Sequence, residues 1–370
     1  MTMARLSIAF ASQDWSTVGD ATYPNGCTWY RCVLPAAILN TRGHQCHVGG
    51  MEIRESEFGI RLRKPLYEKE LFASGHKILV FKLPMHQGNL IAADMAKSKK
   101  IKVVVDIDDF FEGLPSNNRA FSLTNPATNP NNNREIYFRM IDMADALICS
   151  TSFLFDFYKA KHPSKPVFLV RNSIDTVRWP ARRSKKSIPV IGWVGATPWR
   201  ANDLEQLSPF INDYLITRNL VFHHAGHMPN ADYAKPASEL LKIDSDRFFA
   251  TGMQPMTDLP KLFDHIDIGI VPLSNTPFNH AKSYLKGLEY AMAGIPFVAS
   301  RSPEYELLAD AGVGRIADSD KQWMSNLDEL LNYKVREDEA ELNMEIVRNN
   351  FSIESFVGEW ERTYAQITEI

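Results

Sequence analysis

The sequence lacks the cysteine patterns that stabilise small secreted folds or hold zinc. Its 370 residues include four cysteines, Cys27, Cys32, Cys46 and Cys149, and no two of them form a C-x-x-C pair. Neither a disulfide framework nor a structural metal site is therefore expected. Reduced thiols in a cytoplasmic protein are the expectation that follows.

Long apolar segments and a strong charge of one sign are also missing. No stretch approaches membrane-spanning length, and the short apolar run near the start is interrupted by polar residues too early for a signal peptide, so membrane contact is expected to be peripheral. The formal net charge of -3 gives no support for a nucleic-acid partner. Basic runs at Lys97 to Lys102 and Arg182 to Lys186 keep DNA open as an alternative partner.

The composition that remains is that of an ordinary globular protein, with 45% hydrophobic and 23% charged residues. A chain of 370 residues exceeds what one hydrophobic core usually serves, which favours two domains. Short apolar runs bounded by turn residues mark the first half: RLSIAFA from Arg5, QCHVGG from Gln45, KILVFK from Lys77, KVVVDI from Lys102, ALICS from Ala146 and VFLV from Val167. Helical patterns separate most of them, which predicts parallel strands covered by helices on both faces.

The same rhythm returns in the second half after a break. The segment RNSIDTVRWPARRSKKSIP is polar, basic and without periodicity, and indicates a linker. The runs that follow are PVIGWVG from Pro189, LVFHHAG from Leu220, RFFATG from Arg247, DIGIVPL from Asp267, PFVAS from Pro296 and GRIA from Gly314. We therefore expect an α/β protein of two Rossmann-like doubly wound domains, residues 1–172 and 173–350, facing across a cleft where ligands bind at the strands' carboxyl ends. Residues 351–370 are expected to form a closing amphipathic helix that packs back toward the first domain.

The segment from Asp267 to Ser300 carries the most chemical information. It is predicted to form a strand, a loop, a helix and a second strand, with an apolar stripe beginning at Ala281. Lys282, Lys286 and Glu289 recur on another face of that helix. Cations beside the free N–H groups of a helix N-terminus suit an anion such as a diphosphate, and a carboxylate deeper in the helix accepts hydrogen bonds from sugar or ribose hydroxyls. The alternative is a solvated i,i+3 ion pair without a ligand.

These elements resemble the retaining glycosyltransferases of the GT-B architecture, in particular the large family with a Glu-x7-Glu motif (glycosyltransferase group 1, or family 4, type). LEYAMAGIPFVAS resembles the end of that motif with Glu289 as its second glutamate, VRNSIDTVRW the hinge, WVGAT the first donor-domain loop, and FFATGMQPMTDLPKLFDHIDIGIVPL the segment that holds the base. In the first half NGCTWYR and VVVDIDDFFEGLP resemble a subgroup met in bacterial and phage surface-glycan genes. The resemblance implies a nucleotide-sugar donor carrying UDP or GDP, retention, and no metal cofactor.

The chain departs from the family at several positions. Ala281 stands where the first glutamate of the motif, which contacts the donor sugar, would be, and DIDD occupies the strand end where many relatives carry a histidine. Arg200 is the one cation placed to serve for the usual Arg and Lys of the first loop. A surface arginine ahead of a helix capped by Asn202 or Asp203 is the competing interpretation.

Charge builds on the departing diphosphate during glycosyl transfer, so a metal-free site needs fixed cations and N–H dipoles. We assign this role to Arg200, Lys282 and Lys286 with the backbone N–H groups of Ser283 and Tyr284. The resemblance further implies a donor-binding set, in which Glu289 holds the ribose and Met253 and Gln254 the base: Gly195, Ala196, Gly226, His227, Met253, Gln254, Ser283, Tyr284, Leu285, Lys286 and Glu289.

The acceptor side is assigned to Tyr30, Arg31 and Asp106, and Asp108 and Asp109 are counted with the catalytic residues. Three carboxylates this close need a cation, a proton or hydroxyl partners. They could orient hydroxyls and receive the acceptor proton, hold a divalent metal as an Asp-x-Asp pair, or cap the next turn. Arg31 paired with an acidic neighbour is an equally open interpretation.

The histidine cluster, His223, His224 and His227, does not favour a metal, because alternation along a strand puts the first two on opposite faces. The function expected is transfer of a sugar from a nucleotide-sugar to an acceptor hydroxyl on a glycan, lipid or protein, with DNA less favoured. No cofactor is expected, and a divalent metal is not favoured. A nucleotide-sugar epimerase and a degenerate nucleotide-sugar-binding module are the alternatives.

Overall fold

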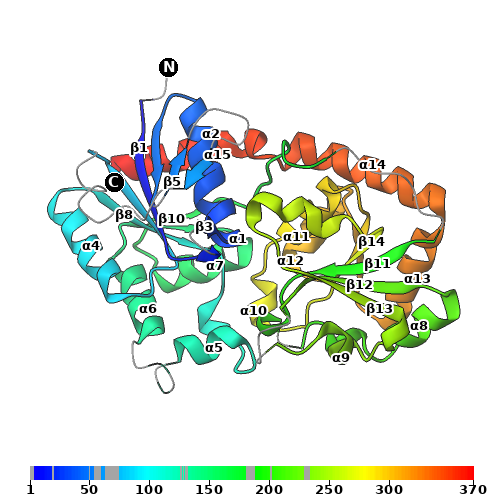
Figure 1. Ribbon diagram of the computed structural model, residues 1–370. Helices are drawn as coiled ribbons and strands as arrows, with labels where there is room; N and C mark the ends of the chain where they lie inside the picture. The colour runs from blue at the N-terminus through cyan, green and yellow to red at the C-terminus, as the bar shows by residue number, and fades with distance from the viewer. Residues whose placement is uncertain are drawn as a thin grey trace. The chain divides into compact units, whose positions relative to one another are not determined.

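The computed structural model describes residues 4–18, 21–49, 51–53, 60–62, 75–125, 127, 129, 132–180, 188–200, 202–228 and 234–370 (Figure 1). The basic run from Arg182 to Lys186 lies outside them. The chain divides into two compact units. Unit 1 comprises Met1–Glu112, Ser122–Asp175 and Ile353–Ile370, and unit 2 comprises Gly113–Phe121 and Thr176–Ser352.

Unit 1 is built on an eight-stranded sheet with the order β10-β9-β8-β7-β1-β4-β5-β6. Its parallel strands are β1 (Ser7–Ser12), β4 (Gln45–Val48), β7 (Ile78–Lys82), β8 (Lys102–Ile107), β9 (Ala146–Cys149) and β10 (Val167–Leu169). These are the six apolar runs of the first half, so that prediction is confirmed. Antiparallel strands β5 (Met51–Ile53) and β6 (Ile60–Leu62) extend the sheet, and β2 (Trp15–Val18) pairs with β3 (Ala21–Pro24) in a separate hairpin.

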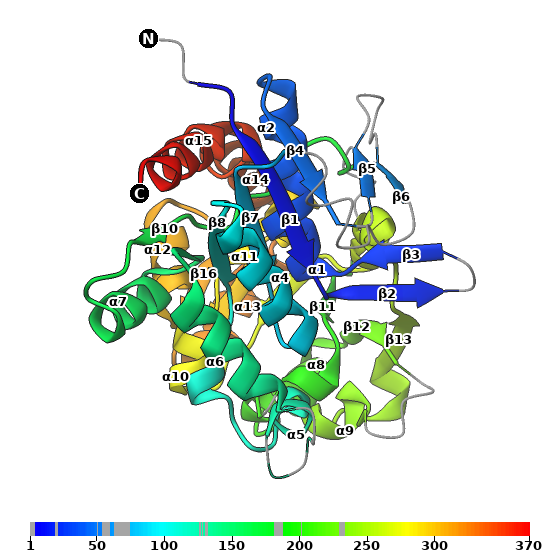
Figure 2. The same cartoon turned by 90° about the vertical axis from the view of Figure 1, so that its left-hand side faces the viewer.

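Helices cover both faces of this sheet. The crossovers from β1 to β4 and from β7 to β8 run in opposite directions along the sheet, so their right-handed connections place helices on opposite faces. Figure 2 shows α2 (Leu34–Thr41) packed beside α15 (Ile353–Glu369), and α4 (Gln87–Ser98) beside α6 (Asn133–Met143). The remaining elements are α1 (Gly26–Thr28), the π-helical turn η1 (Trp29–Val33), η2 (Phe111–Gly113), α5 (Arg119–Thr124) and α7 (Ser152–Lys161).

Unit 2 has a six-stranded, fully parallel sheet with the order β13-β12-β11-β14-β15-β16. The strands are β11 (Val190–Val194), β12 (Val221–His227), β13 (Phe248–Gly252), β14 (Ile268–Val271), β15 (Phe297–Ser300) and β16 (Arg315–Ala317). Each corresponds to one of the six runs predicted in the second half. The strand order reverses between β11 and β14, and this is the position where open α/β sheets bind ligands at the carboxyl ends of their strands.

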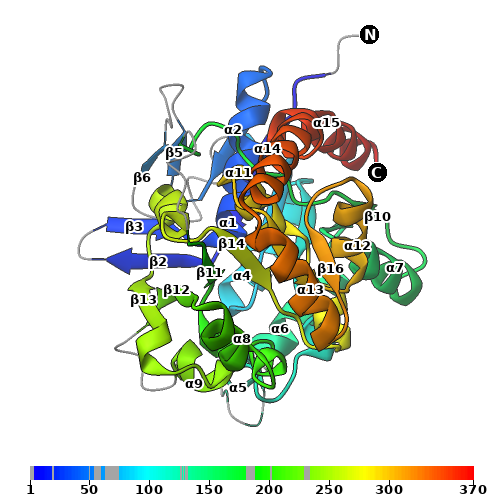
Figure 3. The same cartoon turned by 90° about the vertical axis from the view of Figure 1, so that its right-hand side faces the viewer.

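One face of the unit 2 sheet packs against α8 (Ile211–Arg218) and α13 (Asp320–Leu331), which Figure 3 shows near each other. The Tyr214 hydroxyl joins these helices by donating to Asp328 at 3.0 Å. Opposite them, α11 (Leu285–Met292) and α12 (Pro303–Asp310) pack on the other face, where Gly287 leaves room for Phe297 and Leu308. The other elements are η3 (Thr197–Trp199), η4 (Glu205–Leu207), α9 (Ala237–Leu241), η5 (Ser245–Arg247), η6 (Met256–Phe263), α10 (Pro277–His280) and α14 (Tyr333–Asn350).

The last helix, α15, has the apolar stripe that the sequence predicted. Val357, Trp360, Tyr364 and Ile367 are buried at helical spacing. It belongs to unit 1, although the chain reaches it only after completing unit 2. Among the described residues, no helix combines the length and apolarity that membrane crossing would need.

Candidate functional site

The turn after β11 and the end of β12 form the centre of the candidate site in unit 2. The Gly195 N–H donates to the Ala225 carbonyl at 2.9 Å. Gly226 has a φ of +105°, and a Cβ atom there would lie 2.7 Å from the Gly195 oxygen and 3.0 Å from the sulfur of Met253. Glycine is therefore required at Gly226 both for its backbone conformation and for space. Three of the predicted donor residues, Gly195, Gly226 and Met253, thus meet at one point.

The His224 side chain stabilises this turn through a hydrogen bond to its backbone. Its ring Nε2 lies 2.9 Å from the Gly195 carbonyl oxygen, and its ring packs 5.0 Å from that of Trp193. Burial lowers its pKa to about 4, so the ring is neutral at neutral pH. A carbonyl can only accept, so Nε2 must carry the hydrogen. His227, the last residue of β12, lies 5.7 Å from this ring.

His223 faces away from His224, as strand alternation predicts. It stacks on Phe249 at 4.4 Å and lies 3.0 Å from the Thr251 hydroxyl. No group of three or more His, Cys, Asp or Glu side chains in the described ranges is placed to hold a metal ion.

Arg200 follows the short helix η3, to which Ala196 is the N-terminal neighbour. Asn118, from the Gly113–Phe121 segment, donates to the Trp199 carbonyl at 3.1 Å, and the Arg200 carbonyl accepts from Asp203 at 3.2 Å. The Arg200 side chain is half-buried, and within the described part of the chain no carboxylate pairs with it. The loop is thus held through its backbone while the guanidinium stays available.

Asp203 does not cap a helix after Arg200, which was one interpretation of the sequence. The next helical turn, η4, has Leu204 in its cap position. The Asp203 carboxylate is 3% exposed and accepts from the Ser274 N–H at 2.9 Å and from the Asn279 amide at 2.6 Å. Buried acceptors need such donors, so the carboxylate joins the loop after β11 to the loop after β14.

The prediction that the helix begins near Ala281 is wrong, because α11 begins only at Leu285, and a short helix, α10, lies in the preceding segment. Thr276 caps α10 by accepting from the Asn279 N–H at 3.2 Å, and Pro277 occupies the first helical position. α11 begins only at Leu285, after Tyr284 in its cap position. The signal was a threonine followed by proline, which favours a helix start at that point.

Lys282 and Ser283 consequently lie in the turn between α10 and α11 rather than in a helical first turn. The Lys282 ammonium sits 4.3 Å from the centroid of the Phe278 ring, within cation–π distance. Tyr284 is fully buried, and its ring packs edge-on against Phe351 at 5.5 Å. Lys282 therefore precedes the N-terminus of α11 instead of standing two turns before Glu289 on one face.

Lys286 and Glu289 form an ion pair at 2.5 Å near the start of α11. The Glu289 side chain is only 5% exposed, so this is not the solvated pair of the alternative interpretation. The neighbouring Tyr290 fixes α11 to the sheet, because its hydroxyl accepts from the Val194 N–H and lies 3.1 Å from the Gly192 carbonyl. Glu289 is thereby held at a defined position relative to the turn after β11.

Tyr305 of α12 shows that Arg200 and Glu289 share a neighbourhood. Burial raises the pKa of its hydroxyl, Arg200 acts to lower this pKa, and Glu289 acts to raise it. Such opposing effects require both charges to lie near the same hydroxyl. Two predicted residues that are 89 positions apart in the numbering are therefore brought together.

In unit 1, Arg31 is paired with Asp106, as one interpretation of the sequence proposed. Nε and Nη2 donate to the carboxylate at 2.9 and 2.7 Å, and Nη1 donates to the Val170 carbonyl at 2.8 Å. The guanidinium also lies 4.8 Å from the Trp360 ring. Arg31 and Asp106 are 1% and 0% exposed, so neither projects from the surface of its unit, and Tyr30 beside them is buried too.

The second aspartate of this strand end, Asp108, is paired with Lys82 at the end of β7. Burial raises the pKa of Asp108 and the Lys82 ammonium lowers it, and the ammonium prevails. Asp109 is half-buried next to Asp108. Protein side chains thus supply a cation to two of the three carboxylates, Asp106 and Asp108, and Lys82 was not foreseen.

Several positioning residues escaped the sequence analysis: His224, Asp203, Tyr290, Tyr305 and Lys82. A signal existed for Lys82, because a lysine closing an apolar strand beside a strand that ends in DIDD needs a carboxylate partner. No comparable signal marks Tyr290 or Tyr305. Their hydroxyls act on backbone groups and charges that only the folded chain brings near.

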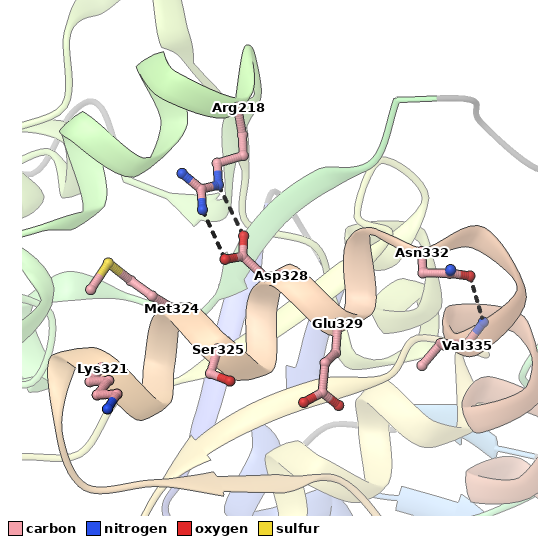
Figure 4. A pocket seen from close by; sticks show the side chains of 8 residues that line it. All are labelled: Arg218, Lys321, Met324, Ser325, Asp328, Glu329, Asn332 and Val335. Atoms are coloured by element: carbon pink, nitrogen blue, oxygen red, sulfur yellow. Dashed lines mark hydrogen bonds and ion pairs between the residues drawn. The ribbon is translucent and has the colours of Figure 1, made fainter.

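The pockets of the described part of unit 2 include the following two. One, of about 690 Å³, lies beside α13 and contains the Arg218–Asp328 ion pair, away from the predicted donor residues (Figure 4). The other, of about 400 Å³, lies at the carboxyl ends of β14, β15 and β16.

The arrangement was compared with known proteins. No protein-family model and no curated protein matches the chain. Solved structures match it over nearly its whole length. Sucrose-phosphate synthase from Thermosynechococcus elongatus has a TM-score of 0.67 and 13% identity, covering 99% of this chain and 100% of its own. A glycosyltransferase from Rickettsia africae ESF-5 has a TM-score of 0.62 and 13% identity, covering 98% of each chain. Anabaena HepE in complex with UDP has a TM-score of 0.61 and 14% identity, covering 98% of this chain and 100% of its own.

At such identities the likeness is one of fold. The chain has the mixed α/β fold of two Rossmann-like parallel sheets seen in GT-B glycosyltransferase structures. The expected fold class is thereby confirmed.

Proposed function

We propose that this chain is a glycosyltransferase that moves a sugar from a nucleotide-diphosphate-sugar to an acceptor hydroxyl, with retention and without a metal. The observation that supports it most is the convergence at the carboxyl edge of the unit 2 sheet. There the glycine turn of Gly195 and Gly226 and the ion-paired Glu289 lie near Tyr290 and Tyr305, together with Arg200, which has no carboxylate partner in the described ranges. The fold shared with sucrose-phosphate synthase and UDP-bound HepE is consistent with this function.

The chemistry assigned to each residue follows from its charge and position. Arg200 and Lys282, with the N–H groups of Ser283 and Tyr284, neutralise the charge that develops on the departing diphosphate. Glu289 accepts hydrogen bonds from the ribose hydroxyls, while Lys286 holds the carboxylate in place.

The base is proposed to lie beside Met253 and Gln254, which follow β13, and next to Gly226 and His227. Met253 is 51% exposed, so its thioether presents an apolar surface to a planar ring. Ala196 and Leu285 complete the donor side through their backbones. UDP and GDP remain the two nucleotides to test first.

Unit 1 is proposed to bind the acceptor, on a glycan, lipid or protein, at the edge that carries Asp108 and Asp109. A carboxylate whose pKa is lowered is a poor base, so Asp108 orients a hydroxyl rather than receiving its proton. Arg31 and Asp106 position this edge through their buried pair and need no contact with substrate.

Nucleotide binding is the first test. A ligand that binds only the folded state raises the melting temperature, so UDP, GDP and their sugars are screened against the wild-type chain by thermal shift. Glu289→Gln and Lys282→Ala are expected to weaken the stabilising nucleotide, whereas Arg218→Ala, in the other pocket, is the matched control that leaves it unchanged. Equal binding by all variants would sink the assignment of this edge.

Turnover is the second test. Arg200→Ala should reduce donor cleavage about 100-fold, because loss of one preorganised donor to a developing anion costs that much. Cleavage is followed by nucleotide release with and without EDTA, and product anomers by NMR. Undiminished cleavage in Arg200→Ala, inhibition by EDTA, inversion of the anomer, or an isomerised donor without transfer would each contradict a named part of the proposal.

A further inference from the structure

The 400 Å³ pocket lies at the same carboxyl edge of unit 2, on the far side of β14 from the glycine turn. Leu273 after β14, Ser300 at the end of β15 and Ala317 at the end of β16 form its base, and Trp323 of α13 adds to the apolar wall. None of the proposed donor residues lines it. It is therefore a separate feature of the edge where ligands bind in folds of this class.

The charge of the lining determines which ligands fit. Arg301 lies between two carboxylates, pairing with Glu306 and, at 3.1 Å, with Asp318, and Asp320 adds a third carboxylate. One arginine against three carboxylates leaves negative charge in excess, so a phosphate or another anion is disfavoured. The described residues contain no group of three acidic or imidazole side chains placed for a metal ion.

The lining also has hydrogen-bonding capacity that the protein does not use. Arg301 donates to Oε1 of Glu306 and to Oδ2 of Asp318. The second oxygen of each carboxylate can accept a hydrogen bond from a ligand. The Ser302 hydroxyl is buried, with the residue 3% exposed, and finds no partner among the described residues. A buried hydroxyl is seldom left unsatisfied in a folded protein, so a ligand or water at this wall would complete it.

We propose that this pocket binds an uncharged, hydroxyl-rich ring, that is, one sugar residue. The carboxylates can accept hydrogen bonds, Arg301 can donate them, and the wall is apolar. Together these groups match a ring that carries both hydroxyls and C–H faces. This proposal rests on the proposed function, because that function names two molecules that could supply the sugar residue. They are an acceptor glycan and the nucleotide-sugar donor itself. Its position fits either source, because Gln206 of the lining donates to the Asp203 carbonyl at 2.9 Å and Asp203 ties the loop that carries Arg200 to that after β14.

Binding is tested by saturation-transfer NMR with maltotriose, cellotriose and triacetylchitotriose at millimolar concentration, in the absence of nucleotide. At least one trisaccharide should give a signal with the wild-type chain, and this signal should fall about tenfold in the double variant Glu306→Gln/Asp318→Asn. Asp328→Asn removes an equivalent arginine partner in the other pocket and should keep the signal. Because these carboxylates are each 44% exposed, the variants should fold, which circular dichroism verifies. Silence with all three trisaccharides, or an unchanged signal in the double variant, overturns the proposal.

The two sources are separated by the donor. If the donor's sugar occupies the pocket, the double variant weakens UDP-glucose or UDP-N-acetylglucosamine but leaves UDP unchanged. If an acceptor glycan occupies it, donor affinity stays constant and the KM for the trisaccharide rises with little change in kcat. Trisaccharide binding without any nucleotide binding would support sugar binding by the pocket and contradict the proposed function. Nucleotide binding without trisaccharide binding would contradict sugar binding by the pocket and leave the proposed function unaffected.

Discussion

The carboxyl edges of the two sheets use charge in opposite ways. In unit 1, Arg31 with Asp106 and Lys82 with Asp108 form two pairs whose side chains are at most 10% exposed. In unit 2 the edge is shaped by a glycine turn and by hydroxyl and imidazole hydrogen bonds, and the Arg200 guanidinium has no carboxylate partner in the described ranges. Charges that neutralise each other hold a fold together, whereas a cation without a partner is available to a ligand. We infer that the two buried pairs of the first edge contribute mainly to stability, whereas Arg200 leaves one cation of the second edge available to a ligand.

The largest effect is expected from breaking the buried pair of unit 1. Arg31→Met leaves the Asp106 carboxylate buried without its cation and should lower the free energy of unfolding by about 3–5 kcal/mol. Urea denaturation measures this difference.

The double variant Arg31→Met/Asp106→Leu is the control, since replacing both partners by apolar side chains removes the unpaired charge. It should recover most of the lost stability. If the single and double variants unfold alike, the pair does not have the structural role that distinguishes unit 1.

Acid should act on the unit 2 edge through His224. Its folded-state pKa, about 4, lies below the ordinary histidine pKa of 6.5, so the unfolded chain binds the additional proton between these two pH values. Stability is therefore fully present above pH 6.5 and is lost as the pH falls toward 4, by roughly 3 kcal/mol at most for a shift of this size.

His224→Gln isolates this effect, because the amide can still donate to the Gly195 carbonyl but does not titrate in this range. The unfolding free energy of the variant should decline less than that of the wild type between pH 6.5 and 4. Parallel pH profiles for the two proteins would show that the ring is not kept neutral under the turn.

The smallest effect belongs to an ion pair outside both edges. Arg218 and Asp328 are 38% and 41% exposed, and Arg218 lowers the pKa of Asp328 mainly by hydrogen bonding. Asp328→Asn should cost less than about 1 kcal/mol, and less still in high salt, because solvent screens exposed pairs. A loss as large as that of Arg31→Met would erase the distinction between buried and exposed pairs on which the comparison rests.

Sequence reasoning succeeded for the strands because burial on both faces leaves an unbroken apolar run. The runs KVVVDI and DIGIVPL predicted β8 and β14 for this reason. It failed for the hairpin of β2 and β3, which is short and packs outside the main sheet, so that neither apolar runs nor regular alternation mark it. It also began the helix near Ala281, whereas α11 begins at Leu285, because the apolar periodicity from Ala281 onward does not register the turn before Tyr284.

The candidate residues of unit 2 were found by pattern, but their grouping was not. Glu289 and Arg200 could be singled out as a carboxylate on a helix and a cation after a strand. That both charges act on Tyr305, and that Tyr290 fastens α11 to β11, depends on side chains from α11, α12 and the loop after η3. No regular spacing of residues in the sequence predicts hydrogen bonds made by tyrosine hydroxyls in this way.

The amino-acid sequence by itself determined the two α/β halves, the carboxyl-edge positions of the polar residues and the glycines of the turn, because hydrophobic periodicity and backbone sterics are local properties. Only the tertiary structure decided which charges neutralise each other. Arg31 meets Asp106 and Lys82 meets Asp108 because parallel strands distant in sequence end side by side, while no carboxylate of the described chain is brought to Arg200. Pairing of charges is a long-range property, and it separates the paired cations Arg31 and Lys82 of unit 1 from Arg200 of unit 2.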